Sequence, residues 1–227
     1  MGEFVSVKAS DGHGLSAYVA KPEGTAKGAV VIVQEIFGVN PSIQGVADHY
    51  AKHGYLAAAP ALFDRYERDL QLGYGPEDMK KAFELYGKLK PETALLDVAA
   101  AFKHIESAGK TAVLGFCYGG LMSWLSATRA KSLGITPAAT VGYYAGGIGS
   151  VATETPVCPV LLHFGADDDH IGNDQVDAVR SAHPDVTIYL YEGAGHAFAN
   201  PARPSFVPAA AETADERSLA FLHKHLG

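Results

Sequence analysis

The hydrophobic positions along the chain change their spacing repeatedly, from short continuous or alternating runs to runs with helical spacing. Short apolar runs rich in β-branched residues are typical of strands, and apolar residues three and four positions apart are typical of amphipathic helices. The short runs predict strands at 3–8, 14–20, 29–33, 55–59, 111–114, 140–144, 160–164 and 187–191. The helical spacing predicts helices at about 43–53, 77–88, 92–107, 173–181 and 208–225, and one more that opens after Cys117.

The order of these elements predicts an α/β fold with a mainly parallel sheet and helices on both faces. Strands 3–8 and 14–20 flank a turn at 11–14, which indicates an antiparallel hairpin at the N-terminus. The length and the absence of repeats and linkers favour a single domain over residues 1–227. Ligands of such sheets bind at the carboxyl ends of the strands, where the candidate residues described below are found.

Composition narrows the class of protein and its partners. The chain is 48% hydrophobic and 19% charged, as ordinary globular proteins are. A net charge of -7 argues against a nucleic-acid partner, because no stripe of Lys and Arg is available to neutralise phosphates. The N-terminus lacks the features of a signal peptide, and no apolar run reaches the roughly 20 residues that span a bilayer. We expect no membrane partner and favour a monomer.

The strongest local motif is GFCYGG at residues 115–120, which has the form G-x-C-x-G between a predicted strand and a helix. A nucleophile on such a tight turn needs glycines two residues before and after it, because side chains there would collide. The turn places Cys117 at a helix N-terminus, where the dipole favours a thiolate, and directs the Tyr118 N–H toward a developing oxyanion. The alternative is a buried, inert cysteine.

The second cysteine, Cys158, lies between Val157 and Pro159 and has no such setting, so we interpret it as structural. Two cysteines form at most one disulfide, and nothing in their surroundings indicates one. A reducing, cytoplasmic compartment fits this usage best.

A base and an acid follow later strands. His196 lies in EGAGHAF at 192–198, just past strand 187–191, and is a better candidate base than the helical pair His49 and His53. The acid is expected among Asp167, Asp168 and Asp169, which follow strand 160–164. The order nucleophile, acid, base is that of α/β-hydrolases. Two alternatives for the carboxylates are helix capping and metal binding with His163 or His170.

These motifs together resemble the dienelactone hydrolase family over nearly the whole chain. The resemblance is carried by QEIFGVN at 34–40, GFCYGG at 115–120, GYY at 142–144, HFG with the Asp cluster at 163–169, and AGHAF at 194–198. It implies an α/β-hydrolase fold and a Cys117, His196 and Asp168 triad, because the family's acid lies three residues after the glycine of H-x-G. It also implies that Glu35 contacts the nucleophile and helps to form the thiolate, and that the Ile36 N–H is the second oxyanion donor.

The same resemblance implies a hydrolase of lactone or activated ester bonds that acts through a thioester acyl-enzyme, without a cofactor or a metal. Two arginines that hold the substrate carboxylate in family members are not matched, because Asn200 and Met79 stand in their places. Lys80, Lys81 and Arg203 are candidate replacements, and Tyr86 is a candidate pocket residue within 61–90. The alternatives are a general carboxylesterase or thioesterase and, more remotely, a non-catalytic ligand-binding protein on a hydrolase scaffold.

Overall fold

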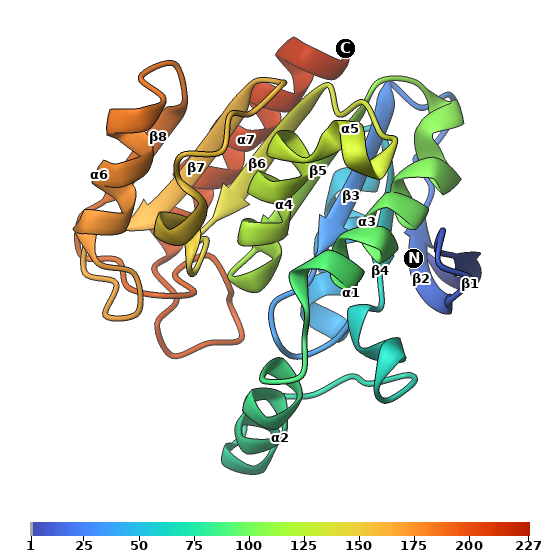
Figure 1. The fold of residues 1–227 in the computed structure, drawn as a ribbon, viewed down its shortest axis with the longest axis horizontal. Coiled ribbons are helices and arrows are strands. Elements are labelled where there is room, and N and C mark those ends of the chain that lie inside the picture. Colours follow the sequence, from blue (N-terminus) through green and yellow to red (C-terminus); the bar gives the residue numbers. More distant parts are fainter. Residues whose placement is uncertain (1) are drawn as a thin grey trace.

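The computed structural model describes residues 2–227 and contains one eight-stranded sheet (Figure 1). Its strands are β1 Glu3–Lys8, β2 Gly14–Ala20, β3 Gly28–Val33, β4 Tyr55–Pro60, β5 Thr111–Phe116, β6 Ala139–Tyr143, β7 Val160–Gly165 and β8 Thr187–Tyr191. The spatial order is β1-β2-β4-β3-β5-β6-β7-β8. β1 pairs antiparallel with β2, and β2 with β4, whereas every other pair is parallel. The predicted parallel sheet with an N-terminal hairpin is confirmed.

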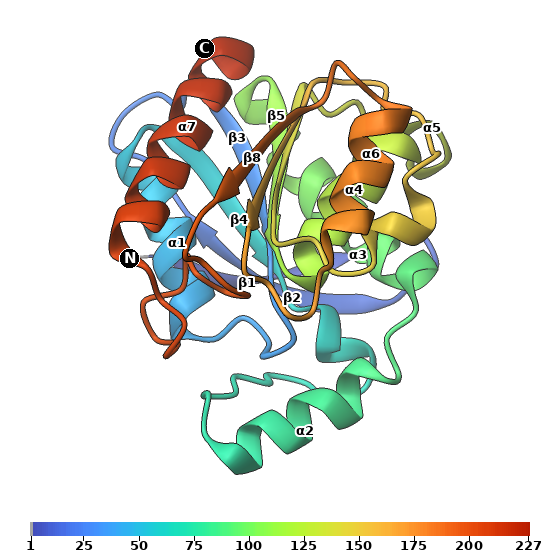
Figure 2. The same cartoon turned by 90° about the vertical axis from the view of Figure 1, so that its left-hand side faces the viewer.

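Helices cover both faces of this sheet (Figure 2). They are α1 Pro41–Lys52, α2 Pro76–Tyr86, α3 Pro91–Ile105, α4 Tyr118–Thr128, α5 Ala130–Leu133, α6 Asn173–Ala182 and α7 Pro208–Leu226, with short 3-10 turns η1 Leu62–Arg65, η2 Glu106–Ala108 and η3 Ile148–Val151. α1 and α7 lie on one face, and α3, α4 and α6 lie on the other. All six residues of β3 are buried, as expected of a strand covered on both sides.

The predicted helix boundaries differ from the observed ones by one or two residues, for a local reason. Pro41, Pro76 and Pro91 each occupy a first helical position, where proline is favoured because its missing N–H has no helical partner. The hydrophobic spacing alone predicts that these helices begin one or two residues later. The four-residue α5 was not predicted, because one turn is too short to carry a period.

The strand order creates a crevice at the carboxyl end of the sheet. From β3 the chain passes first to β4 on one side and later to β5 on the other. The connections that leave β3 and β5 therefore diverge, and ligands of open α/β sheets bind at such switch points. None of the helices in residues 2–227 is both long and apolar enough to cross a membrane.

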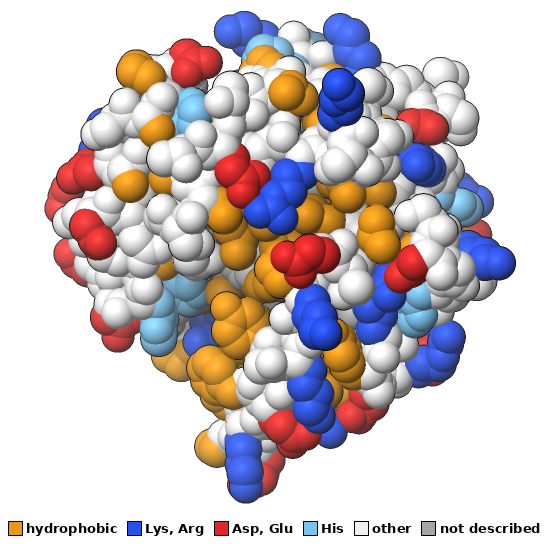
Figure 3. Space-filling view, in the orientation of Figure 1, with side chains coloured by type: hydrophobic (Ala, Val, Ile, Leu, Met, Phe, Trp, Pro, Cys, Tyr) orange, Lys and Arg blue, Asp and Glu red, His pale blue; other side chains and the backbone are white. Residues whose placement is uncertain are grey.

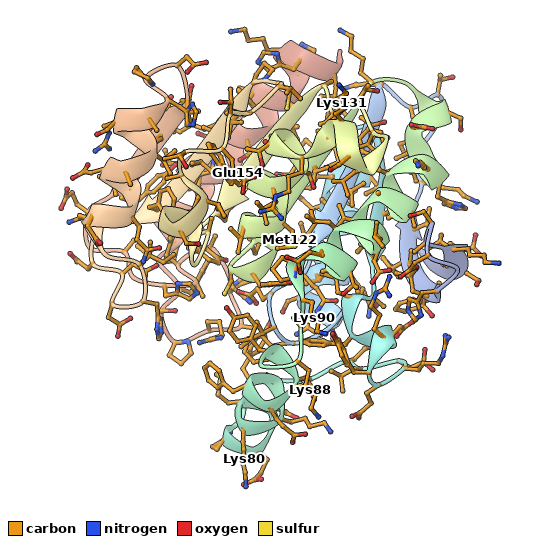
Figure 4. The ribbon with its side chains drawn as sticks, viewed as in Figure 1. Lys80, Lys88, Lys90, Met122, Lys131 and Glu154 are labelled. Carbon is orange, nitrogen blue, oxygen red and sulfur yellow. The ribbon has the colours of Figure 1, made fainter. Side chains whose placement is uncertain are left out.

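Residues 61–90 leave the sheet after β4 and return at α3. Their helix α2 protrudes beyond the carboxyl ends of the strands (Figure 1). Phe83 and Tyr86 are 54% and 42% exposed, and hydrophobic surface is visible beside α2, interrupted by basic side chains (Figure 3). Lys80 extends from the far end of α2, whereas Lys88 and Lys90 lie where the segment rejoins the main body (Figure 4).

A buried ion pair ties the start of this segment to the sheet layer. Arg65, at the end of η1, donates from Nε and Nη2 to the two carboxylate oxygens of Asp97 on α3, both at 2.7 Å. Its Nη1 donates to Asp11 in the hairpin turn at 2.8 Å. The Asp97 side chain is fully buried. Three segments that are distant in the sequence therefore meet at one guanidinium.

We predict that Asp97→Ala lowers the free energy of unfolding by about 3 kcal/mol, because it removes one partner of a buried, bidentate charge pair. At this chain length such a loss shifts the melting temperature by roughly 6–12 °C. Thermal unfolding measures it. Asp177→Ala breaks the exposed pair with Arg180 and is the matched control, for which we expect less than about 1 kcal/mol. Equal losses in the two variants would contradict the prediction.

Candidate active site

The Cys117 turn has the strained backbone that a nucleophile elbow requires. Cys117 joins β5 to α4 with φ 55° and ψ -115°, a conformation that L-residues rarely adopt. A Cβ on Gly115 would lie 2.1 Å from the carbonyl oxygen of Gly119, and one on Gly119 would lie 2.2 Å from that of Val33. The predicted steric need for both glycines is confirmed. The Cys117 N–H donates to Tyr143 at 3.0 Å, which holds the turn against β6.

His196 and Asp168 approach each other from two neighbouring loops. Asp168 follows β7, His196 follows β8, and the Nδ1 of His196 lies 2.9 Å from Oδ2 of Asp168. The other oxygen of Asp168 accepts the N–H groups of His170 at 2.8 Å and Ile171 at 3.0 Å. Of the three clustered aspartates, Asp169 is instead exposed beside His170. The structure thus places Asp168, the residue implied by the family resemblance, against His196.

Both pKa shifts favour a charged His196 paired with Asp168. Burial opposes charge on Asp168, but hydrogen bonds with His196 and two backbone N–H groups lower the pKa of the carboxyl below its usual value. Burial also opposes charge on His196, yet hydrogen bonds with Asp168 and Cys117 raise the pKa of the imidazole to about 10. The imidazole of His196 is therefore held by the Asp168 carboxylate through Nδ1, and the influence of Cys117 on its pKa indicates that the thiol is nearby.

The candidate oxyanion donors come from two connections, the turn after β5 and the connection after β3. Tyr118 is the first residue of α4, so its N–H has no intrahelical partner. Ile36 is in the connection after β3. The Gln34 side chain fixes this connection through two hydrogen bonds. The Gln34 side chain donates to the Glu35 carbonyl at 3.2 Å and accepts the N–H of Leu62 at 3.1 Å. The loop with Ile36 is thereby tied to η1.

Glu35 is buried in this loop, but its hydrogen bonds go elsewhere than the resemblance implies. Its Oε2 accepts the Asn200 side-chain amide at 2.9 Å and a long hydrogen bond from the Tyr74 hydroxyl at 3.5 Å. Within residues 2–227 its carboxylate makes no hydrogen bond with Cys117, so the expected contact is absent from this conformation. Burial raises the pKa of Glu35, although the charge of Arg203 opposes the rise.

The physical reason for this orientation is the amide at position 200. Asn200 is 7% exposed and also donates to the Tyr74 hydroxyl at 2.9 Å, so one amide group holds both Tyr74 and Glu35. The sequence comparison identified Asn200 only as a missing arginine. Its role in positioning Glu35 depends on residues 165 positions apart in the chain, and no local pattern reveals it.

The three candidate substrate residues lie in different places. Tyr86 packs edge-on against Tyr118 at 5.7 Å, and burial together with the charge of Cys117 raises the pKa of its hydroxyl, which places it near the nucleophile. Arg203 lies over the rings of Phe37 and Tyr74, each at 5.4 Å, beside Glu35. Lys81 instead forms a 2.7 Å ion pair with Glu67 on the surface.

Tyr144 is a site residue that sequence analysis did not single out. It follows β6 at φ 36°, is fully buried, and its ring centroid lies 5.2 Å from that of His196. Its hydroxyl has no hydrogen-bond partner among the described residues. Burial, and then the charges of Glu35 and Cys117, raise the pKa of Tyr144 well above its usual value. The GYY motif was the available signal, but it does not tell which tyrosine faces the site.

His163, the other histidine of the motifs, has a structural environment. Its ring nitrogens lie 2.8 Å from the Tyr191 hydroxyl and 3.0 Å from that of Ser218, and burial lowers its pKa to about 3. It therefore stays neutral within the core. Nowhere in residues 2–227 do three His, Cys, Asp or Glu side chains converge as metal ligands would.

Comparisons with known proteins identify the family and the fold of this chain. The sequence model of the dienelactone hydrolase family matches residues 15–226. A carboxymethylenebutenolidase of Pseudomonas putida is 31% identical and aligns over 97% of this chain and 95% of its own length. An Azospirillum brasilense protein assigned to the same enzymes is 32% identical, over 98% and 99%. A crystal structure from Klebsiella pneumoniae, assigned to the dienelactone hydrolases, superposes with TM-score 0.79 at 30% identity, covering 96% of this chain and 98% of its own.

Proposed function

The chain belongs to the dienelactone hydrolase family, and on this premise we propose that it hydrolyses lactone or activated ester bonds with Cys117 as a covalent nucleophile. The observation that supports the proposal most directly is the 2.9 Å contact of His196 with Asp168, in the loops beside a Cys117 turn with the strained backbone of a nucleophile elbow. Similar proteins include carboxymethylenebutenolidases, whose name denotes a lactone substrate. The fold is the predicted α/β-hydrolase fold.

Acylation begins with the proton of the Cys117 thiol already on His196, the charged state that the raised pKa of the imidazole favours. The sulfur then attacks the carbonyl carbon, and the carbonyl oxygen becomes an oxyanion that accepts the N–H groups of Ile36 and Tyr118. Each such donor is worth roughly 100- to 1000-fold in rate. The carbon–oxygen bond of the leaving group breaks, His196 returns the proton to a leaving alkoxide, and a thioester on Cys117 remains.

Deacylation uses the same groups with water as the nucleophile. Asp168 accepts a hydrogen bond from Nδ1 of His196, which leaves Nε2 as the nitrogen that takes a proton from water. The hydroxide attacks the thioester, the sulfur leaves as thiolate, and a carboxylic acid is released. Because a thiolate is a good leaving group, this chemistry suits enol-lactones and activated esters better than amides.

We propose that Glu35 serves as a secondary proton acceptor for Cys117. Its burial raises the carboxyl pKa, and a carboxyl with a raised pKa is suited to accept a proton from a neighbouring thiol. Asn200 and Tyr74 hold it in the observed orientation. Contact with Cys117 requires Glu35 to rotate away from these partners, so its participation is tied to a movement of one side chain.

A substrate carboxylate cannot be bound here by the two arginines of the family resemblance, because Asn200 and Met79 stand in their places. Arg203 lies over the Tyr74 ring and its charge acts on Glu35, and we propose it as the group that receives a substrate carboxylate. The uncharged Asn200 favours the second candidate function, a carboxylesterase or thioesterase that accepts uncharged substrates. Lys81 remains a weaker candidate because Glu67 already pairs with it.

A cytoplasmic location and a monomeric state stay predictions for this enzyme. The first rests on the low cysteine content of the chain, with two cysteines in 227 residues.

Trapping the acyl-enzyme tests the mechanism. We expect acid quenching of a reaction with p-nitrophenyl acetate to yield protein with one added acetyl group, released by hydroxylamine as thioesters are. Peptide mass spectrometry should place the group on Cys117, and the Cys158 peptide from the same digest is the internal control. An acetyl group on a serine, histidine or lysine that forms and decays at the rate of turnover would overturn the proposed nucleophile.

A further inference from the structure

A cavity of about 570 Å³ is lined by residues of α1 and α7. These two helices lie on the face of the sheet opposite α4 (Figure 2). Its outer part is formed by both helices and by the connection 199–208. Its inner end reaches Glu35, Tyr144 and Asn200, all less than 10% exposed. Cys117 and His196 are not among the described residues that line it. The cavity therefore ends at Glu35 and at Tyr144, whose ring centroid lies 5.2 Å from that of His196.

The walls of this cavity combine aromatic rings with carboxylates. Four aromatic side chains line it, from α1, β5, the end of β6 and the connection before α7: Tyr50, Phe116, Tyr144 and Phe206. Its acidic groups are Glu35 at the inner end and Glu212 and Asp215 near the mouth. No lysine or arginine lines it within residues 2–227. His49 also lines the cavity, and its Nε2 lies 2.9 Å from Oδ2 of Asp215.

Two polar groups at the inner end have unused hydrogen-bonding capacity. The Tyr144 hydroxyl is buried without a partner in the described chain. Leaving a buried hydroxyl unpaired costs free energy, so a ligand that supplies the missing partner gains from it. The protein hydrogen bonds to the Glu35 carboxylate both go to Oε2, which leaves Oε1 without one among residues 2–227.

We propose that this cavity is a second ligand site and that it binds a small organic ammonium ion with an apolar body. Aromatic faces attract organic cations through their quadrupoles, and the effect is largest where the cation is desolvated. The carboxylates supply the opposite charge, and an ammonium group has separate N–H donors for the Tyr144 hydroxyl and for Oε1 of Glu35. A ligand carboxylate would be repelled by Glu212 and Asp215 at the mouth, and no lysine or arginine among the described lining residues offsets them. An occupant that touches Glu35 also opposes its rotation toward Cys117.

Binding of three isosteric probes tests this assignment by calorimetry on the wild-type chain. We expect phenethylammonium to bind at least about tenfold more tightly than 2-phenylethanol, since one cation–π contact and one ion pair are added. The carboxylate 3-phenylpropionate should bind more weakly than either. Equal affinities, or the tightest binding by the carboxylate, would overturn the assignment of the ligand class. Binding is read out without turnover, so the result does not depend on whether Cys117 is the nucleophile.

Two variants test the location of the site. Ala211→Trp places an indole into the cavity from α7 and should weaken phenethylammonium binding at least about tenfold. Ala209→Trp adds the same side chain at an exposed position of the same helix that does not line the cavity, and it should leave binding unchanged. Val46→Phe fills the cavity from α1 if the α7 variant fails to fold. Undiminished binding by a folded, cavity-filled variant would refute the site.

Discussion

Replacing Cys117 by alanine is expected to lower kcat/KM for both an enol-lactone and p-nitrophenyl acetate by at least about 1000-fold, with the fold retained. The reason is that loss of the nucleophile removes the covalent route entirely and leaves only binding and oxyanion stabilisation. Alanine also lacks bulk that would disturb the turn, whose backbone at φ 55° is held by Tyr143 and the surrounding glycines. Steady-state kinetics on both substrates, with melting temperature as the check on folding, measures the effect.

Cys158→Ala is the matched control for this variant. Cys158 is partly buried, and burial raises the pKa of its thiol to about 12, so it holds its proton at neutral pH. We expect its replacement to change kcat/KM less than twofold. If Cys117→Ala is as active as the wild type, Cys117 is not the nucleophile and the proposed mechanism is wrong. If only the simple ester is cleaved by the wild type and this requires Cys117, the esterase alternative replaces the lactonase.

The elbow could be predicted because all of its determinants are local. A strand, a strained residue and a helix follow one another within a few positions, and Gly115 and Gly119 are needed for contacts inside that same turn or with the adjacent β3. The parallel sheet was predictable for a similar reason, since continuous apolar runs such as β3 alternate with helical spacing. Proline at a first helical position moved the helix ends by only one or two residues.

Parts of the site that depend on long-range packing could not be predicted from local patterns. Local sequence does not distinguish Asp168 from its neighbours, because the choice depends on where the loop after β7 meets the loop after β8. Glu35 is held by Asn200 from the far end of the chain. The cavity between α1 and α7 exists only once both helices lie on the sheet. In each case the determining contact joins elements that the sequence separates widely.

Asp168→Asn is expected to lower kcat/KM by about 1000-fold while preserving the melting temperature within a few degrees. The amide matches the carboxylate in size, and its oxygen can still accept the N–H groups of His170 and Ile171. It does not stabilise the imidazolium, and it favours the wrong tautomer of His196 when its amide group faces Nδ1. Removal of this negative charge also lowers the pKa of His196 from about 10, because Asp168 is one of the two groups that raise it.

The pKa of His196, followed by NMR titration, separates this positioning role from general damage to the fold. Asp169→Asn is the control, since Asp169 is exposed beside His170 and should affect neither kcat/KM nor the titration of His196. A comparable loss of activity in Asp169→Asn would show that Asp168 is the wrong choice for the catalytic acid. An unchanged His196 titration in Asp168→Asn, despite reduced activity, would mean that Asp168 acts on the loop rather than on the imidazole. A fall in both quantities in Asp168→Asn alone links the observed 2.9 Å contact to catalysis.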